Sequence, residues 1–156
     1  MKFLFVPMAA EYADEIVYRW HYDGTYAFYD MEADEDDARI LLNKEYWVTI
    51  HRAVLDEHRA LIGFASFYTE AGDFWLSLGL KPELTGQGLG EAFVRECVSY
   101  VSSHYTLPGN SIKLAVARFN RRAIKVYRKV GFVESGREVR KTHIGNVDFL
   151  EMTLRC

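Results

Sequence analysis

The sequence predicts an α/β fold in which a mixed, mostly antiparallel sheet of about seven strands is flanked by about four helices. Short apolar or alternating runs, separated by short polar joints, are typical of antiparallel hairpins. Between other runs lie stretches with apolar residues at helical spacing. A strand–helix–strand crossover over residues 74–117 predicts a parallel pair in the middle of the sheet.

The predicted elements follow the order βααβββαβαββ. The strands are apolar or alternating runs at 2–6, 46–54, 61–69, 74–80, 112–117, 133–140 and 147–154. The helices have a repeating apolar face and cover 10–20, 34–43, 89–101 and 123–130. Gly131 closes the last helix in the position that glycine prefers. A chain of 156 residues without repeats or linkers predicts one domain over residues 1–156.

Composition narrows the class of protein. A net charge of -3 disfavours nucleic acid or an anionic membrane as the main partner. Only two cysteines occur, Cys97 and Cys156, which fits a reducing compartment, and no apolar stretch is long enough to span a bilayer. We therefore expect a cytoplasmic protein with no membrane partner and no metal site.

A glycine-rich turn carries the first chemical signal. Strand 74–80 is followed by Pro82, and Gly86, Gly88 and Gly90 then open a helix. Glycines let successive backbone N–H groups point into one concavity, and a helix N-terminus favours negative charge, so the turn suits a phosphate or pyrophosphate. A plain flexible turn is the alternative. Glu91 stands where a Rossmann fingerprint needs glycine, and the Gly-Lys-Ser/Thr of a P-loop is absent.

A second segment strengthens the functional interpretation of the glycine-rich turn. Asn120, Ala123, Tyr127, Gly131 and Phe132 follow a short apolar strand. Together the two segments resemble the GNAT superfamily of N-acetyltransferases, in which Arg/Gln-x-x-Gly-x-Gly/Ala begins the coenzyme-A-binding helix. The resemblance implies acetyl-CoA as the cosubstrate and extends, through the element order, over essentially the whole chain.

The resemblance assigns roles to residues of this chain. It implies that the coenzyme lies against three groups of residues, which are Leu78, Gly79 and Leu80 at the strand end, Gly86, Gln87, Gly88, Leu89 and Gly90 in the turn, and Asn120, Ala123 and Tyr127. Backbone N–H groups near Leu78 would bond the thioester oxygen, and Gly79 would permit a bulge. Tyr127 would protonate the departing thiolate as a general acid, unless it is only a core aromatic. Asn120 is also a preferred N-cap, which alone would explain it.

One residue departs from the family pattern. The Arg or Gln that begins the first motif is Thr85 here, so a long side chain that bonds the pyrophosphate is replaced by a short hydroxyl. Gln87 or a nearby basic residue could compensate.

The sequence defines the site for the amine acceptor less clearly than the site for the coenzyme. The family builds acceptor sites between the first two helices, where this chain has Tyr22, Tyr26, Tyr29 and Asp30. Rings and acids suit a cationic amine, of a small molecule or a peptide. The acids at 34–37 are more typical of a solvated helix start.

The general base is not identified by the sequence. Strand 74–80 has no carboxylate, and the candidates are Glu70, Asp73, Glu83, Asp30 and His143, with Ser77 as holder of a relay water.

Three functions stay open from the sequence alone. The first is an N-acetyltransferase that works by direct attack in a ternary complex, and a homodimer is compatible with it. The second is a non-catalytic acyl-CoA-binding sensor on the same fold. The third is a nucleic-acid-associated module that uses the basic residues of 118–129, although coenzyme phosphates explain part of that charge.

Overall fold

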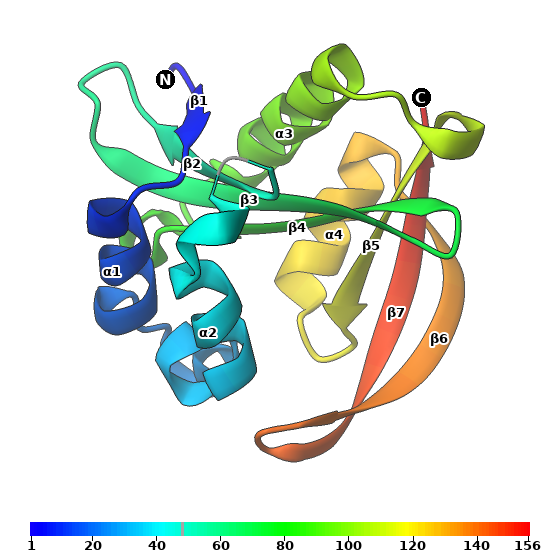
Figure 1. The fold of residues 1–156 in the computed structure, drawn as a ribbon. Coiled ribbons are helices and arrows are strands. Elements are labelled where there is room, and N and C mark those ends of the chain that lie inside the picture. The colour runs from blue at the N-terminus through cyan, green and yellow to red at the C-terminus, as the bar shows by residue number, and fades with distance from the viewer. Residues whose placement is uncertain (48) are drawn as a thin grey trace. The chain divides into compact units, whose positions relative to one another are not determined.

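The computed structural model describes residues 1–47 and 49–156 (Figure 1). It divides the chain into two compact units. The first unit comprises Met1–Ser66 and Gly79–Thr85, and the second comprises Phe67–Leu78 and Gly86–Cys156. Strands β3 and β4 contribute residues to both.

The strands form a seven-stranded sheet in the order β1-β2-β3-β4-β5-β7-β6. Their bounds are β1 Leu4–Pro7, β2 His51–Leu55, β3 Leu61–Glu70, β4 Asp73–Leu80, β5 Ser111–Ala117, β6 Val133–Thr142 and β7 Gly145–Arg155. The pairs β1–β2, β2–β3, β5–β7 and β6–β7 are antiparallel. β4 and β5 are parallel, with Trp75 opposite Lys113. The predicted fold class and the parallel pair are therefore confirmed, and β7 lies between β5 and β6.

In the first unit, α1 (Ala10–Arg19) and α2 (Glu35–Leu42) lie side by side (Figure 1). Their apolar faces contribute Ile16, Val17 and Leu41 to a buried core, which also contains Trp20. Asp34 caps α2, because its carboxylate accepts hydrogen bonds from the N–H groups of Asp36 and Asp37. The acids at 34–37 thus form a helix start, as their sequence pattern indicates.

One predicted strand is shorter than expected. Of the predicted run 46–54, β2 begins only at His51, because Lys44–Tyr46 is a short 3₁₀ helix. Asn43 caps this helix through a hydrogen bond from the Glu45 N–H to its side-chain oxygen. Residue 48, which also falls in the predicted run, lies outside the described residues.

In the second unit, α3 (Gly90–His104) packs against α4 (Arg121–Val130). Phe93, Cys97 and Val101 of α3 are buried, at the positions that the sequence periodicity predicts. Burial raises the pKa of the Cys97 thiol far above its ordinary value. α4 ends at Gly131, which is left-handed with φ +119°.

β6 and β7 form a long hairpin, and β6 is an edge strand of the sheet, as is β1 (Figure 1). The register of this pair shifts between Glu134 and Gly136, which marks a bulge. Most side chains of β6 are exposed and many are charged, with ion pairs between Glu134 and Arg137 and between Glu138 and Arg140. Among the helices of the described residues, none is long and apolar enough to cross a membrane.

Gly79, near the end of β4, is packed tightly in the first unit. A Cβ built on it would overlap the ring of Phe64, at 2.7 Å from Cζ. Phe64 is buried and its ring lies 6.3 Å from that of Trp20, which leaves it little room to move. Gly79 is therefore required by packing, whatever else it does.

We predict that Gly79→Ala lowers the free energy of unfolding by about 1–3 kcal/mol, because the new methyl group overpacks the site. Phe64→Leu in the same chain should recover part of this loss, since it removes the ring that the methyl group meets. Urea denaturation measures both effects. The matched control is Gly136→Ala in β6, where a Cβ would have its nearest contact at 3.4 Å and the change should stay within about 0.5 kcal/mol. Equal losses for the two alanines would contradict the packing argument.

Candidate active site

The turn before α3 has the conformation that a phosphate cradle needs. Gly86 and Gly88 have φ values of +73° and +79°, which other residues rarely adopt. A Cβ built on Gly88 would meet no atom within 4 Å, so the side of the turn toward which a side chain at position 88 would point is open. α3 begins at Gly90, and the carbonyl of Leu89 accepts the helix's first hydrogen bond, from Phe93. Exposed glycines and a helix N-terminus together offer N–H donors of the kind that bind a pyrophosphate, and coenzyme A binding at this turn stays a prediction.

The second predicted group of coenzyme residues lies on α4, in the same unit. Asn120 caps this helix, since its side-chain oxygen accepts a hydrogen bond of 3.1 Å from the Ala123 N–H. α4 approaches the turn closely, because a Cβ on Gly90 would lie 3.5 Å from Cγ2 of Val126. Tyr127, the next residue, is half-buried. The structure therefore brings the glycine turn and α4 together, as the two motifs predict.

Tyr127 is held by the end of its own helix. Its carbonyl accepts hydrogen bonds from the N–H groups of Gly131 and Phe132. Its ring meets that of Phe132 edge to face, at a centroid distance of 5.8 Å. Gly131 and Phe132 thus hold the backbone of Tyr127, and the ring of Phe132 also packs against that of Tyr127. Its role as general acid stays a prediction.

The end of β4 carries the third group. Leu78 belongs to the second unit and lies three residues beyond Trp75, the residue that pairs with β5. Gly79 and Leu80 belong to the first unit. There the carbonyl of Leu80 accepts a hydrogen bond of 2.7 Å from the Tyr22 hydroxyl. A residue of the predicted acceptor segment therefore contacts the end of the strand that the family uses for its coenzyme.

Asp30 organises the acceptor segment. One carboxylate oxygen accepts from the Tyr22 N–H at 2.8 Å, and the other lies 3.0 Å from Nδ1 of His21. This hydrogen bond raises the pKa of His21 above its ordinary value. Glu32 lies 3.7 Å from the other ring nitrogen of His21. The sequence pattern did not single out His21, and an aromatic residue nine positions before an acid gives no signal from which this pairing could be predicted.

Tyr26 and Tyr29 lie on a 3₁₀ helix, Gly24–Tyr29, that the sequence did not predict. Both are half-buried, and Tyr29 meets Phe28 edge to face at 5.1 Å. They share this short segment with Tyr22 and Asp30, so the predicted acceptor residues occupy one region of the first unit.

The candidate bases differ in their surroundings. Asp73 forms an ion pair with Lys113 at 3.2 Å, and its hydrogen bond raises the pKa of that lysine. Glu83 lies 4.0 Å from Lys81. Ser77 and Glu70 are exposed, and so is His143 in the turn between β6 and β7. No candidate is selected by these contacts.

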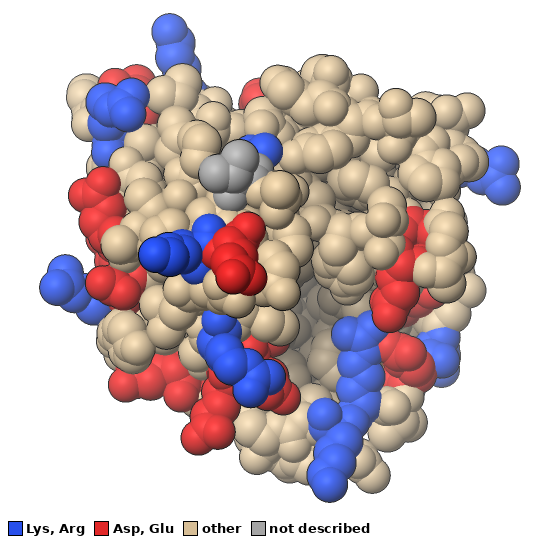
Figure 2. All heavy atoms as spheres, in the orientation of Figure 1, with Lys and Arg blue, Asp and Glu red and all other residues tan. Residues whose placement is uncertain are grey.

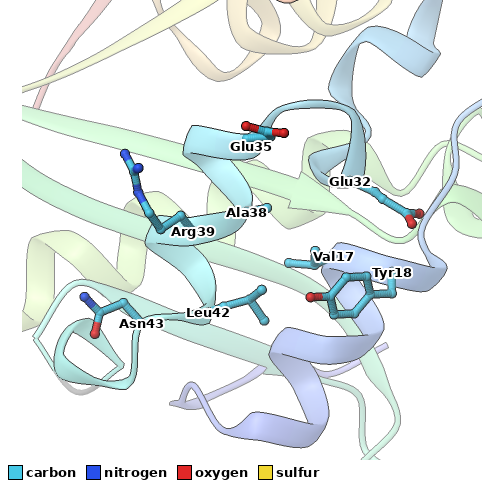
Figure 3. Close-up of a pocket in the computed structure, with 8 residues that line it drawn as sticks. All are labelled: Val17, Tyr18, Glu32, Glu35, Ala38, Arg39, Leu42 and Asn43. Carbon is cyan, nitrogen blue, oxygen red and sulfur yellow. The ribbon is translucent and has the colours of Figure 1, made fainter.

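A separate pocket lies between α1 and α2 (Figure 3). Its volume is about 540 Å³, and it is lined by Val17, Tyr18, Glu32, Glu35, Ala38, Arg39, Leu42 and Asn43. Its lining combines apolar side chains with two carboxylates and the guanidinium group of Arg39, which pairs with Asp36 at 3.0 Å. Figure 2 shows other acidic side chains on the surface that α1 and α2 form. Of the predicted acceptor residues, none lines this pocket. Within the described residues, no group of His, Cys, Asp and Glu side chains could hold a metal ion.

The sheet, the glycine turn and the capped α4 define a coenzyme-A-dependent acyltransferase, and comparison with known proteins identifies the family. The model of the acetyltransferase (GNAT) family matches residues 11–132. The chain therefore belongs to the GNAT family, and it is an acetyl-CoA-dependent N-acetyltransferase. No curated protein matches the sequence significantly.

Solved structures share this fold at low sequence identity. A chimera of spermidine N-acetyltransferase SpeG from Vibrio cholerae and hSSAT aligns with a TM-score of 0.78 and 21% identity, covering 99% of this chain and 96% of the other. Spermidine N-acetyltransferase from Vibrio cholerae, in complex with CoA and spermine, aligns with a TM-score of 0.72 and 20% identity, covering 97% of this chain and 94% of the other. Ribosomal-protein-S5-alanine acetyltransferase from Vibrio fischeri aligns with a TM-score of 0.66 and 16% identity, covering 99% of this chain and 93% of the other.

We predict that Gly88→Asp weakens coenzyme A binding at least tenfold, equivalent to about 1.4 kcal/mol, because it places a negative charge on the open side of the turn. Gly88→Asn is the matched control. Asn tolerates a positive φ about as well as Asp and has nearly the same shape, so it isolates the charge. Calorimetry should show a clearly smaller loss of coenzyme A affinity for Gly88→Asn than for Gly88→Asp. Unchanged affinity in a folded Gly88→Asp protein would remove the turn from the coenzyme site.

We also predict that Tyr127→Phe lowers kcat by about 10²–10⁴-fold while the affinity for coenzyme A stays near normal. The substitution removes the proton donor and keeps the ring that packs on Phe132. Steady-state kinetics and calorimetry on one preparation measure the two quantities. Turnover at the wild-type rate would mean that Tyr127 is a packing residue.

Proposed function

We propose that the enzyme acetylates a primary amine of a small, positively charged molecule by direct attack in a ternary complex. The observation that carries this proposal is the hydrogen bond from the Tyr22 hydroxyl to the Leu80 carbonyl. It joins the segment of rings and acids to the end of β4, near the strand residues from which the resemblance takes the oxyanion donors.

The reaction places three demands on the protein. An alkyl ammonium with a pKa of about 10 must first lose a proton to a base. The amine nitrogen then attacks the thioester carbon, and backbone N–H groups near Leu78 stabilise the oxyanion. The C–S bond breaks, and the thiolate takes the proton of Tyr127. The attacking nitrogen loses its second proton as the amide forms, and this proton, carried by solvent, restores the Tyr127 phenol. Acetyl-CoA supplies the acetyl group, and the products are the amide and coenzyme A.

A cationic acceptor is supported by the chemistry of the first unit. Asp30 and Glu32 carry negative charge beside His21, and Tyr22, Tyr26 and Tyr29 supply ring faces in the same segment. The structures of spermidine N-acetyltransferases, one of them in complex with CoA and spermine, share the fold and give a first acceptor to test. A peptide amine is the second candidate, since the fold is also that of a ribosomal-protein-S5-alanine acetyltransferase.

The family model spans residues of both units, which supports a single acetyltransferase domain over residues 1–156. A cytoplasmic location, where acetyl-CoA is available, and a homodimer complete the proposal.

The test is thiol release from acetyl-CoA with a panel of amines at two ionic strengths. We expect cationic amines such as spermidine to turn over faster than neutral or anionic amines. The preference should shrink at high salt, because screened carboxylates attract a cation less. The Asp30→Asn and Tyr26→Ala substitutions should each reduce the preference for cationic amines.

Glu35→Gln serves as the control, because Glu35 lines the pocket between α1 and α2 and is not one of the predicted acceptor residues. A loss of preference in Glu35→Gln alone would assign the cation to that pocket instead. Equal turnover of cationic and anionic amines, insensitive to salt and to Asp30→Asn, would contradict the proposed substrate class.

A further inference from the structure

The turn before α3 lacks the long polar side chain that its family motif begins with. Thr85 occupies that position, and its hydroxyl donates a hydrogen bond of 2.7 Å to the carbonyl of Pro82. Since a threonine hydroxyl has one proton, this bond commits the only side-chain donor of Thr85 to the short 3₁₀ helix Pro82–Leu84. The contact that the family's Arg or Gln makes therefore has to come from another side chain, and the candidates are Gln87 of the turn and a basic residue of another element.

α4 brings such a side chain to the turn. A Cβ built on Gly86 would lie 3.5 Å from Nη1 of Arg122, and one on Gly90 would lie 3.5 Å from Cγ2 of Val126. Gly86 and Gly90 are four residues apart, and so are Arg122 and Val126. Arg122 and Val126, one helical turn apart on α4, therefore both lie beside the segment from Gly86 to Gly90, with the guanidinium group against Gly86.

The position of Arg122 is fixed by the helix that carries it. Asn120 caps α4 just before Arg122, and Val126 packs one turn further along the same face. Glu91, the acid nearest the turn on α3, pairs with Arg95 at 3.1 Å, so its charge is partly compensated within α3. The side of the turn that faces Arg122 is therefore suited to an anion.

The other basic residues of α4 face a different surface. Arg118, Arg121, Lys125, Arg128, Lys129 and Arg137 line a groove of about 660 Å³ together with Ile124, Leu150 and Glu134. Arg122 does not line this groove. Two adjacent arginines, Arg121 and Arg122, therefore have the same sequence context and different surroundings, which makes each a control for the other.

We infer that Arg122 binds the pyrophosphate of acetyl-CoA and supplies, from α4, the contact that Thr85 cannot make. A guanidinium group can donate two parallel N–H bonds to phosphate oxygens, which a threonine hydroxyl or a lysine ammonium cannot reproduce. The inference rests on acetyl-CoA as the donor substrate and is independent of the identity of the amine.

The experiment compares Arg122→Met with Arg121→Met by calorimetry, using coenzyme A and dephospho-coenzyme A as probes. Methionine keeps a long flexible chain and removes the charge. Arg122→Met should weaken both ligands by a similar factor of about 10–100, as expected for a lost hydrogen bond to a charged group. Arg121→Met should change neither by more than about threefold, and Arg122→Lys should lie between wild type and Arg122→Met.

Donor selectivity provides a second readout. S-acetyl-pantetheine lacks both phosphates of the pyrophosphate, so the wild-type preference for acetyl-CoA over this donor, in kcat/KM, should shrink in Arg122→Met by the same factor as the affinity. A general folding defect would lower both kcat/KM values together and leave the ratio unchanged, which would overturn the inference. Equal losses of coenzyme affinity in Arg122→Met and Arg121→Met would also overturn the inference. A loss of affinity for coenzyme A but not for dephospho-coenzyme A would overturn it too, because it would assign Arg122 to the 3′-phosphate.

These outcomes are separable from those of the proposed function. If no amine of the panel releases thiol while Arg122→Met still loses coenzyme affinity, the proposed function fails and the inference holds. If cationic amines turn over normally and Arg122→Met binds coenzyme A like wild type, the inference fails alone.

Discussion

Contact between the start of α3 and α4 arranges the predicted coenzyme residues of the second unit. Val126 of α4 lies beside Gly90 in the first turn of α3, where a Cβ would meet Cγ2 of Val126 at an ordinary van der Waals distance of 3.5 Å. Tyr127 follows Val126 on α4, so this contact determines how far Tyr127 lies from the glycine turn. The geometry of the predicted site therefore depends on the packing of these two helices.

The sequence predicted the features that depend on neighbouring residues. The Asn120 cap, the end of α4 at Gly131 and the turn at Gly86–Gly90 each follow from the conformational preference of one residue type, and the structure confirms all three. The 3₁₀ helices Gly24–Tyr29 and Lys44–Tyr46 were missed, since their composition resembles that of a loop or a strand. Contacts between distant residues were not predictable either. Tyr22 meets Leu80 only because the chain folds back over many intervening residues.

The two substrates place opposite electrostatic demands on one small protein. The coenzyme is a polyanion, and its predicted residues in the glycine turn and on α4 lie with basic side chains in the second unit. The acceptor segment carries Asp30 and Glu32 in the first unit, with His21 between them. Because both oxygens of Asp30 already accept hydrogen bonds, its charge shapes the segment and attracts cations without needing direct contact with a substrate.

The charged edge strand has a consequence for the folding of the chain. β6 ends the sheet, and its outer edge presents unpaired backbone groups that could template pairing with another chain. Glutamates and arginines along the strand, together with the bulge at Glu134–Gly136, oppose flat strand-to-strand addition. β6 joins the sheet only through β7, so before that pair forms β6 has no partner strand. Its charged side chains then oppose pairing with another chain, and this role is independent of catalysis.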